Sequence, residues 1–130
     1  MGHVPAASRG FAADSGVGLH IQDCCLYLAE IEPQKPTWFY GLGYWTRGNA
    51  EICLLAKRGQ PKRRSKSVHQ FIISPIEEHS KKPDITREKI IELAGDLPRV
   101  ELFARQKTPG WDAWGNEVDS DVSLSVSETR

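Results

Sequence analysis

Apolar residues gather in four short runs along this chain, and polar stretches containing Gly and Pro separate them. Each run has the length of a β-strand, although the first would also suit a buried helix, because a short apolar run does not distinguish the two. Between the third and fourth runs the apolar residues recur at helical spacing instead. The pattern predicts a mixed α/β fold with strands near 24–29, 51–57, 68–73 and 100–104.

The predicted helix covers residues 83–94. Pro83 suits the first turn, where its missing N–H is not needed, and Asp84 places a negative charge near the positive end of the helix. Gly95 is a typical C-terminal stop. We expect the helix to pack one face on the sheet and to lead into strand 100–104, by a right-handed crossover if that strand is parallel to its neighbours. The apolar stripe consists of Thr86, Ile90, Leu93 and Ala94.

A basic connection, residues 58–67, joins the second strand to the third, and we expect these strands to form a hairpin around it. Gly59 and Pro61 prevent regular structure there. One interpretation is a solvated loop; the other is a flexible arm for a polyanion, since Lys and Arg release counterions from phosphate. His69, within the third strand, is expected to be structural. The basic residues are Lys57, Arg58, Lys62, Arg63, Arg64 and Lys66.

Composition limits the class of protein without naming a partner. The 130 residues suffice for one domain, and 17 basic residues balance 17 acidic ones. Cys24, Cys25 and Cys53 lack the spacing of metal ligands, and Cys53 is interpreted as a small buried hydrophobe. We expect a reduced, cytoplasmic protein. No apolar run approaches the roughly 20 residues that span a bilayer, so we expect no membrane contact.

Aromatic residues concentrate between Trp38 and Asn49, interleaved with glycines and Arg47. One interpretation is a glycine-kinked loop whose rings close over the core. The other is a loop that faces nucleic acid, because flat rings stack on an extruded base and Arg47 contacts phosphate. Asn49 and Glu51 stand at the mouth of the next strand and would also serve as loop caps.

Three motifs together resemble a known family. They are Gly41-Leu-Gly-Tyr-Trp-Thr-Arg47, His79-Ser-Lys-Lys-Pro-Asp84 and the stretch Pro98 to Glu117, in which a short strand feeds a polar loop. Residues from about Trp38 to Val118 are similar to the C-terminal half of the MT-A70-like family. Its members are S-adenosylmethionine-dependent methyltransferases that modify the 6-amino group of adenine.

The resemblance implies an incomplete, three-layer α/β domain with a partial Rossmann-like methyltransferase sheet. We expect a poorly ordered segment at 1–37 with one possible strand, the C-terminal part of the methyltransferase domain at 38–118, and a disordered tail at 119–130. Compared with the family, a helix-sized piece is missing between residues 31 and 38, so we expect an incomplete sheet. Because the strand that carries the family's catalytic residues has no counterpart here, we also expect an open, adhesive sheet edge.

The resemblance also assigns residues to S-adenosylmethionine. A Lys at a helix start suits the α-carboxylate, and an amide or carboxylate at a strand end suits the ribose diol. The alternative for each is an ordinary surface residue, or for Arg105 an ion pair with Glu101 or Asp112. The cofactor candidates are Lys82, Phe103, Arg105, Asn116 and Glu117, with Trp114 as a second apolar wall.

The substrate side implied by the resemblance is DNA or RNA. In the family, an Asp-Pro-Pro-aromatic tetrad aligns the target amine. None of the eight prolines here is next to another or follows Asp or Asn, so the tetrad is missing from this sequence. Three hypotheses remain: a truncated methyltransferase that is inactive alone, a non-catalytic nucleic-acid-binding subunit that pairs with a second, active methyltransferase chain, and a small enzyme of unrelated chemistry. The nucleic-acid candidates are Tyr44, Trp45, Arg47, Asn49, Glu51, Arg63, Arg64 and Lys66.

Overall fold

The computed structural model describes residues 18–78 and 81–124. The chain divides into two compact units, residues 1–95 and residues 96–130, and each is described by itself. The predictions for residues 1–17 and for the end of the tail, 125–130, lie outside the described residues. The combination of strands and a helix confirms the mixed α/β class.

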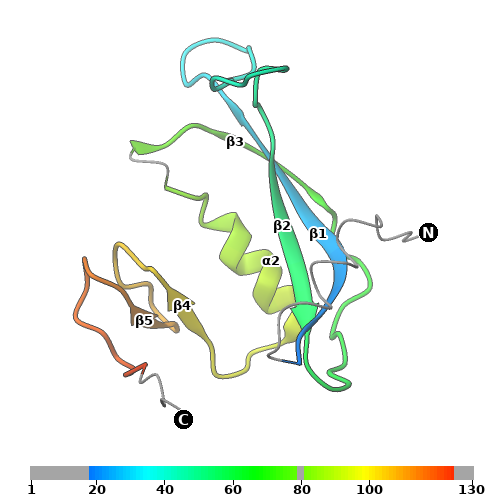
Figure 1. The fold of residues 1–130 in the computed structure, drawn as a ribbon, viewed down its shortest axis with the longest axis vertical. Helices are drawn as coiled ribbons and strands as arrows, with labels where there is room; N and C mark the ends of the chain where they lie inside the picture. The colour runs from blue at the N-terminus through cyan, green and yellow to red at the C-terminus, as the bar shows by residue number, and fades with distance from the viewer. Residues whose placement is uncertain (1–17, 79–80, 125–130) are drawn as a thin grey trace. The chain divides into compact units, whose positions relative to one another are not determined.

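The first unit contains a three-stranded sheet in the order β2-β1-β3. Its strands are β1 (His20–Ile31), β2 (Glu51–Lys57) and β3 (Phe71–Pro75). The central strand β1 is antiparallel to β2 and parallel to β3, as Figure 1 shows. Pro75 is tolerated at the end of β3 because this strand lies at the edge of the sheet.

The predicted hairpin between the second and third strands is wrong. β1 lies between β2 and β3, so these two strands are not neighbours. The third strand also begins at Phe71 rather than at residue 68, and the first is longer than predicted. The physical reason is that β1 offers hydrogen-bonding groups on both edges, and its buried side chains Leu26 and Leu28 form the core together with Ile72 of β3.

The two faces of this sheet differ in burial. Leu26, Leu28 and Ile72 form a small core on one face, with Cys25 and Cys53 packed against it. Because successive side chains of a strand point to opposite faces, their sequence neighbours lie on the other face. That face is apolar and exposed: Ile52, Leu54, Phe71 and Ile73 are 49–71% accessible, and Tyr27 packs against Phe71 with ring centroids 5.9 Å apart.

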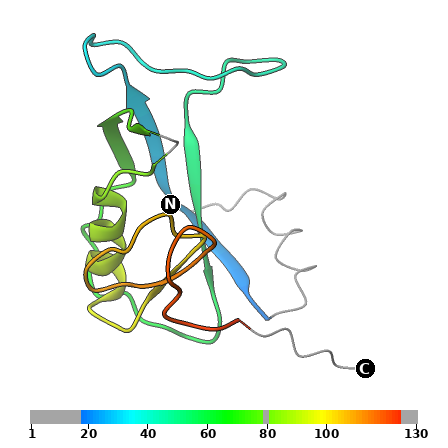
Figure 2. The same ribbon diagram turned by 90° about the vertical axis from the view of Figure 1, so that its left-hand side faces the viewer.

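Helix α2 (Ile85–Ala94) confirms the predicted helix, starting two residues later than expected. Asp84 is the N-cap residue, and its carboxylate pairs with Arg87 at 2.9 Å. The backbone of Gly95 has a φ of 97°, which glycine adopts without strain, and its N–H donates to Ile91 O at 2.7 Å. In Figures 1 and 2 α2 runs alongside the sheet, but none of its residues is fully buried.

The basic connection before β3 lies against α2. The Arg64 N–H donates to Leu93 O at 2.7 Å, and the Lys89 ammonium donates to His69 O at 2.9 Å. The Arg64 side chain lies beside Gly95, where a Cβ would be 2.8 Å from its Cγ. The part of the chain just before β3 is therefore tied to the helix at Arg64 and at His69, rather than projecting from a hairpin.

The second unit contains a separate two-stranded sheet. Its strands are β4 (Val100–Leu102) and β5 (Asp112–Trp114), and they run parallel. Among the described residues of this unit, the buried apolar ones are Ala104 and Ala113, each 2% exposed. The Arg99 guanidinium lies over the Trp111 ring, 5.4 Å from its centroid.

Three expectations about this part of the chain are corrected. Strand 100–104 ends at Leu102, because Phe103 has a φ of 58° and leaves the extended conformation. Strand β5 was expected to be loop. Strand β4 pairs with β5 in a separate sheet, rather than joining the sheet that precedes α2.

Candidate functional site

Predicted cofactor residues lie together at one edge of the second unit. Parallel strands share the edge at which their carboxyl ends lie, and ligands commonly bind there in α/β proteins. Arg105 follows β4 and Glu117 follows β5, and Arg105 Nε lies 3.8 Å from Glu117 Oε2. Asn116 is adjacent, and all three side chains are exposed. Arg105 therefore forms an ion pair with Glu117.

Apolar surface adjoins these polar groups. Phe103 is 79% exposed and meets Trp114 edge to face, with ring centroids 5.3 Å apart. The backbone of Gly115 lies close to that of Ala104, two residues beyond β4, since a Cβ at position 115 would be 2.6 Å from Ala104 O. A non-glycine residue with positive φ, as at Phe103, often marks a functional segment.

Lys82 belongs to the first unit and is paired. Its ammonium lies 2.5 Å from Glu51 Oε2, and both side chains are about half exposed. The structure thereby joins a predicted cofactor residue to a predicted nucleic-acid residue. Lys82 precedes α2, as expected of a residue that assists an anion at a helix start.

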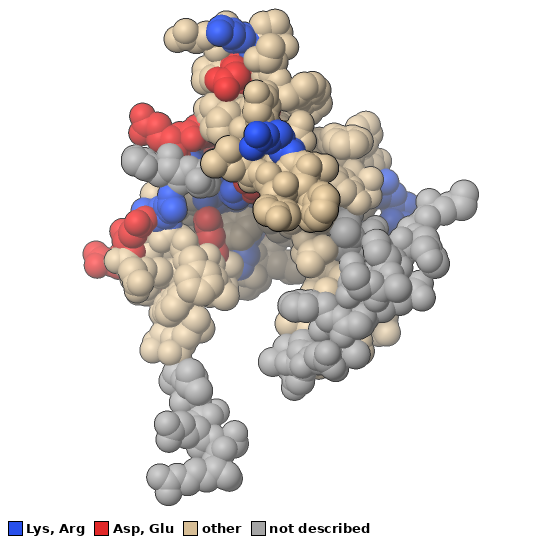
Figure 3. All heavy atoms as spheres, turned by 45° about the horizontal axis from the view of Figure 1, so that its top comes forward, with Lys and Arg blue, Asp and Glu red and all other residues tan. Residues whose placement is uncertain are grey.

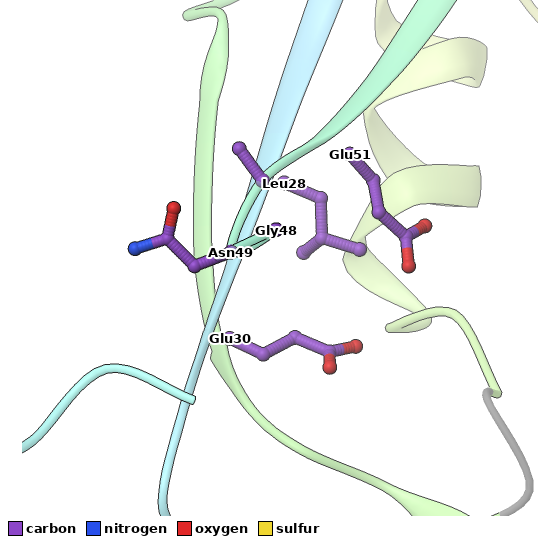
Figure 4. A pocket seen from close by; sticks show the side chains of 6 residues that line it. Leu28, Glu30, Gly48, Asn49 and Glu51 are labelled. Atoms are coloured by element: carbon purple, nitrogen blue, oxygen red, sulfur yellow. The ribbon is translucent and has the colours of Figure 1, made fainter. Parts of the chain in front are cut away.

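A small hollow lies where β1 and β2 begin to diverge. Figure 4 shows the Glu30 and Glu51 carboxylates on the same side, whereas Asn49 points the opposite way. Its volume is about 60 Å³, which corresponds to roughly two water molecules. The hollow is therefore too small for a nucleobase. Sequence reasoning missed Glu30, although the alternation from Leu26 through Leu28 places residue 30 on the same face.

The aromatic segment forms a closed loop with exposed rings. The Gly41 N–H donates to Gly48 O at 2.6 Å and closes the base of the loop. Tyr44 and Trp45 are 95% and 91% exposed, and their rings meet edge to face with centroids 5.6 Å apart. The interpretation that these rings close over the core is therefore wrong, and Arg47 is exposed beside them.

Basic side chains are interspersed with acidic ones. Arg63, Arg64 and Lys66 are exposed on the connection beside α2. Elsewhere in the first unit Lys81 pairs with Glu77 at 2.8 Å. Figure 3 likewise shows blue and red side chains near one another on the face turned toward the viewer. Within the described residues, no helix is long and apolar enough to cross a membrane.

Several methyltransferases are similar to part of this chain. The Type II methyltransferase M.MunI of Mycoplasma sp is 33% identical over 85 residues, which cover 63% of this chain and 36% of that protein. A putative N(6)-adenosine-methyltransferase MT-A70-like protein of Medicago truncatula is 31% identical over 78 residues, or 58% of this chain and 13% of the relative. The human N(6)-adenine-specific methyltransferase METTL4 is 43% identical over 51 residues, or 38% of this chain and 11% of the relative.

Two of these relatives carry names that specify methyl transfer to N(6) of adenosine or adenine. The family model described as MT-A70 matches residues 25–117. The chain belongs to the MT-A70 family, which confirms the resemblance carried by the three motifs. It spans about a third of the length of the Mycoplasma methyltransferase and a smaller share of the other relatives.

Proposed function

We propose that this chain forms part of an N(6)-adenine methyltransferase that acts on DNA or RNA with S-adenosylmethionine, and that alone it transfers no methyl group. Family membership across residues 25–117 carries the first statement. The second rests on the 130-residue sequence, which contains no Asp-Pro-Pro-aromatic tetrad. Alignment of reacting groups supplies about 7–11 kcal/mol of such a barrier, so its loss leaves no measurable transfer.

The cofactor supplies the methyl group on its sulfonium when it is bound. Asn116 and Glu117 suit its ribose, because an amide and a carboxylate at a strand end accept hydrogen bonds from both hydroxyls. The Arg105 guanidinium donates to the same sugar, and Phe103 and Trp114 provide an apolar wall. The exposure of the three polar side chains at one edge supports this assignment.

Lys82 is proposed to bind the α-carboxylate of the cofactor. Its ammonium would exchange Glu51 for that carboxylate. The exchange costs little, since a half-exposed surface ion pair contributes only about 0–1 kcal/mol.

The aromatic loop is proposed to contact the nucleic acid. The exposure of both Tyr44 and Trp45 supports this role, because stacking of a base on an aromatic ring contributes about 1–3 kcal/mol. Arg47 would pair with phosphate, and Arg63, Arg64 and Lys66 would add contacts along the backbone. Asn49 and Glu51 border the loop on its β2 side.

Cofactor binding is tested by calorimetric titration of the chain with S-adenosylmethionine. Glu117→Ala is expected to weaken binding about tenfold or more, since a hydrogen bond to a charged group contributes about 1.5–3 kcal/mol. Asn116→Ala is expected to weaken it severalfold, since a neutral hydrogen bond contributes about 0.5–1.5 kcal/mol. Gln106→Ala is the matched control, because Gln106 is exposed on the neighbouring loop. Equal affinities in all four proteins would refute the ribose assignment.

Methyl transfer is tested with labelled cofactor and single- and double-stranded DNA and RNA. We expect no label at adenine with this chain alone. Label incorporated by the unmodified chain and lost in Asn116→Ala and Glu117→Ala would overturn the argument from the missing tetrad. It would show that another residue here, such as Asn49 or Glu51, aligns the amine.

Nucleic-acid binding is tested by fluorescence anisotropy across a salt series. The double variant Tyr44→Ala/Trp45→Ala should lose affinity at every salt concentration, whereas Leu42→Ala, 93% exposed in the same loop, should not. Replacing Arg63, Arg64 and Lys66 with Ala should reduce the salt slope by about one unit per lost phosphate contact. An unchanged slope would identify the connection as a solvated surface.

A second candidate function is a non-catalytic, nucleic-acid-binding subunit that pairs with an active methyltransferase chain. The exposed apolar face of the first sheet favours it, because large apolar patches typically mark contacts with another protein. The two candidates differ in one observable property: only the binding subunit must retain nucleic-acid affinity without the cofactor.

A further inference from the structure

Two cysteines on neighbouring strands lie close together in the first unit. Cys25 belongs to β1 and Cys53 to β2, and the Cys25 thiol donates to Cys53 Sγ across 3.9 Å. Both side chains are half-buried and pack against the core of Leu26, Leu28 and Ile72. Both are therefore held by surrounding packing while remaining partly accessible from solvent.

A β-bulge explains how these side chains meet. The register shifts between Cys24, which pairs with Leu54, and Leu26, which pairs with Cys53. In a bulge two residues of one strand oppose a single residue of the other, so the extra residue loses its ladder partner and its side chain is redirected. Cys25 is that extra residue, and its thiol reaches the side chain of Cys53.

The contact also favours reactivity. Hydrogen bonding from the Cys25 thiol lowers the pKa of Cys53 to about 6, while burial acts in the opposite direction. The thiolate is the nucleophile in thiol–disulfide exchange. A disulfide requires a sulfur–sulfur distance of about 2.05 Å, and thiols at 3.9 Å approach it by small rotations about their side-chain bonds.

We propose that Cys25 and Cys53 are a redox-sensitive pair that a small disulfide, such as oxidised glutathione, converts into a cross-strand disulfide. The Cys53 thiolate attacks one sulfur of the oxidant, forms a mixed disulfide and releases one thiolate. The Cys25 sulfur then attacks Cys53 Sγ and releases the second. Overall, two protein thiols and one small disulfide yield one protein disulfide and two small thiols.

The cross-link would join the two strands that flank residues 32–50. This segment carries the exposed rings of Tyr44 and Trp45, so oxidation fixes the base from which the aromatic loop extends. Because the link also closes a loop in the unfolded chain, the oxidised protein should unfold at a higher urea concentration. The inference is independent of the proposed function, since it needs neither cofactor nor nucleic acid.

The test exposes the full chain, at low concentration, to excess oxidised glutathione. Remaining thiols are then alkylated and the protein is digested with trypsin without reductant. We expect a monomer whose mass is lower by two hydrogens and which carries one alkyl group, on the cysteine that remains outside the disulfide. The peptides of residues 10–47 and 48–57 should be joined by a bond that dithiothreitol breaks.

Three conservative variants identify the partners. Cys24→Ser should still form the cross-link, whereas Cys25→Ser and Cys53→Ser should yield only glutathione adducts. Circular dichroism checks that each variant is folded, and the unmodified chain provides the peptide map directly. A cross-link that persists in Cys25→Ser, a bond between Cys24 and Cys25, or adducts alone in the unmodified chain would each overturn the proposal.

Discussion

Leu28 is expected to be the most informative single position for the stability of the first unit. It lies on the central strand β1, is 7% exposed, and forms one third of a core completed by Leu26 and Ile72. The same side chain lines the hollow beside Glu51. Replacing Leu28 with Ala removes buried methyl groups without adding a polar atom, so the result reports packing alone.

The expected loss can be estimated from the surroundings of Leu28. Buried Leu→Ala substitutions destabilise proteins by about 2–5 kcal/mol, depending on how far the site collapses around the space left behind. Cys25 and Cys53 are only half-buried and have room to move, which favours the lower end. We therefore expect about 2–3 kcal/mol, or roughly a 30- to 150-fold fall in the ratio of folded to unfolded protein.

Urea unfolding followed by circular dichroism measures this change. With a urea slope of about 1–3 kcal/mol per molar, Leu28→Ala should lower the midpoint by about 1 M or more. Leu42→Ala makes the same chemical change at a side chain that is 93% exposed, and should leave the midpoint almost unchanged. Equal midpoints for the two variants, or a transition without cooperativity in the unmodified chain, would refute the assigned core.

Two further predictions concern the second unit. Gly115→Ala should disrupt the pairing of β4 with β5, since the new Cβ would meet Ala104 O at 2.6 Å. The disruption should appear as a change in Trp fluorescence. Gly48→Ala is the control and should leave the fluorescence unchanged, because nothing lies within 4 Å of a Cβ at that position. Asp121 accepts hydrogen bonds from Lys107 and from the Ala113 N–H, which lower its pKa. The stabilisation by Asp121 is therefore fully present above the ordinary Asp pKa of about 4, and it is lost as the pH falls through the lower pKa of the folded protein. With Asp121→Asn, the free energy of unfolding should therefore depend less on pH in the acid range.

Local patterns sufficed where an element is specified by its own residues. The run Glu51–Lys57 has a continuous apolar centre between charged ends, and β2 has these bounds. Pro83 and Gly95 likewise bracket α2 within two residues. The partner of a strand is not encoded in its periodicity, which is why the pairing of β3 with β1 was missed. Strand β5 was missed because three residues between glycines carry too little apolar pattern.

In the candidate site, too, the sequence indicated the residues but not the contacts between them. Residue types at strand ends and a helix start identified Arg105, Glu117 and Lys82 as candidates. Their contacts depend on three-dimensional pairing: Arg105 meets Glu117 only because β5 lies parallel to β4, and Lys82 meets Glu51 at the start of β2. The proximity of Cys25 and Cys53 requires both a strand pair and a bulge, neither of which the sequence indicated.

The position of β1 between an antiparallel and a parallel partner also sets an expected order of folding. Helix α2 needs only local contacts and forms on the sub-microsecond to microsecond timescale of helices. Pairing of Leu28 with Glu51 closes a shorter segment than pairing of Tyr27 with Phe71, and long-range strand pairs form more slowly. We therefore expect β3 to join last, after the β1–β2 pair has formed. Until it does, one edge of β1 presents unpaired backbone groups. We therefore expect the pairing of this edge to be the slow step of refolding, and aggregation that increases with protein concentration to begin there.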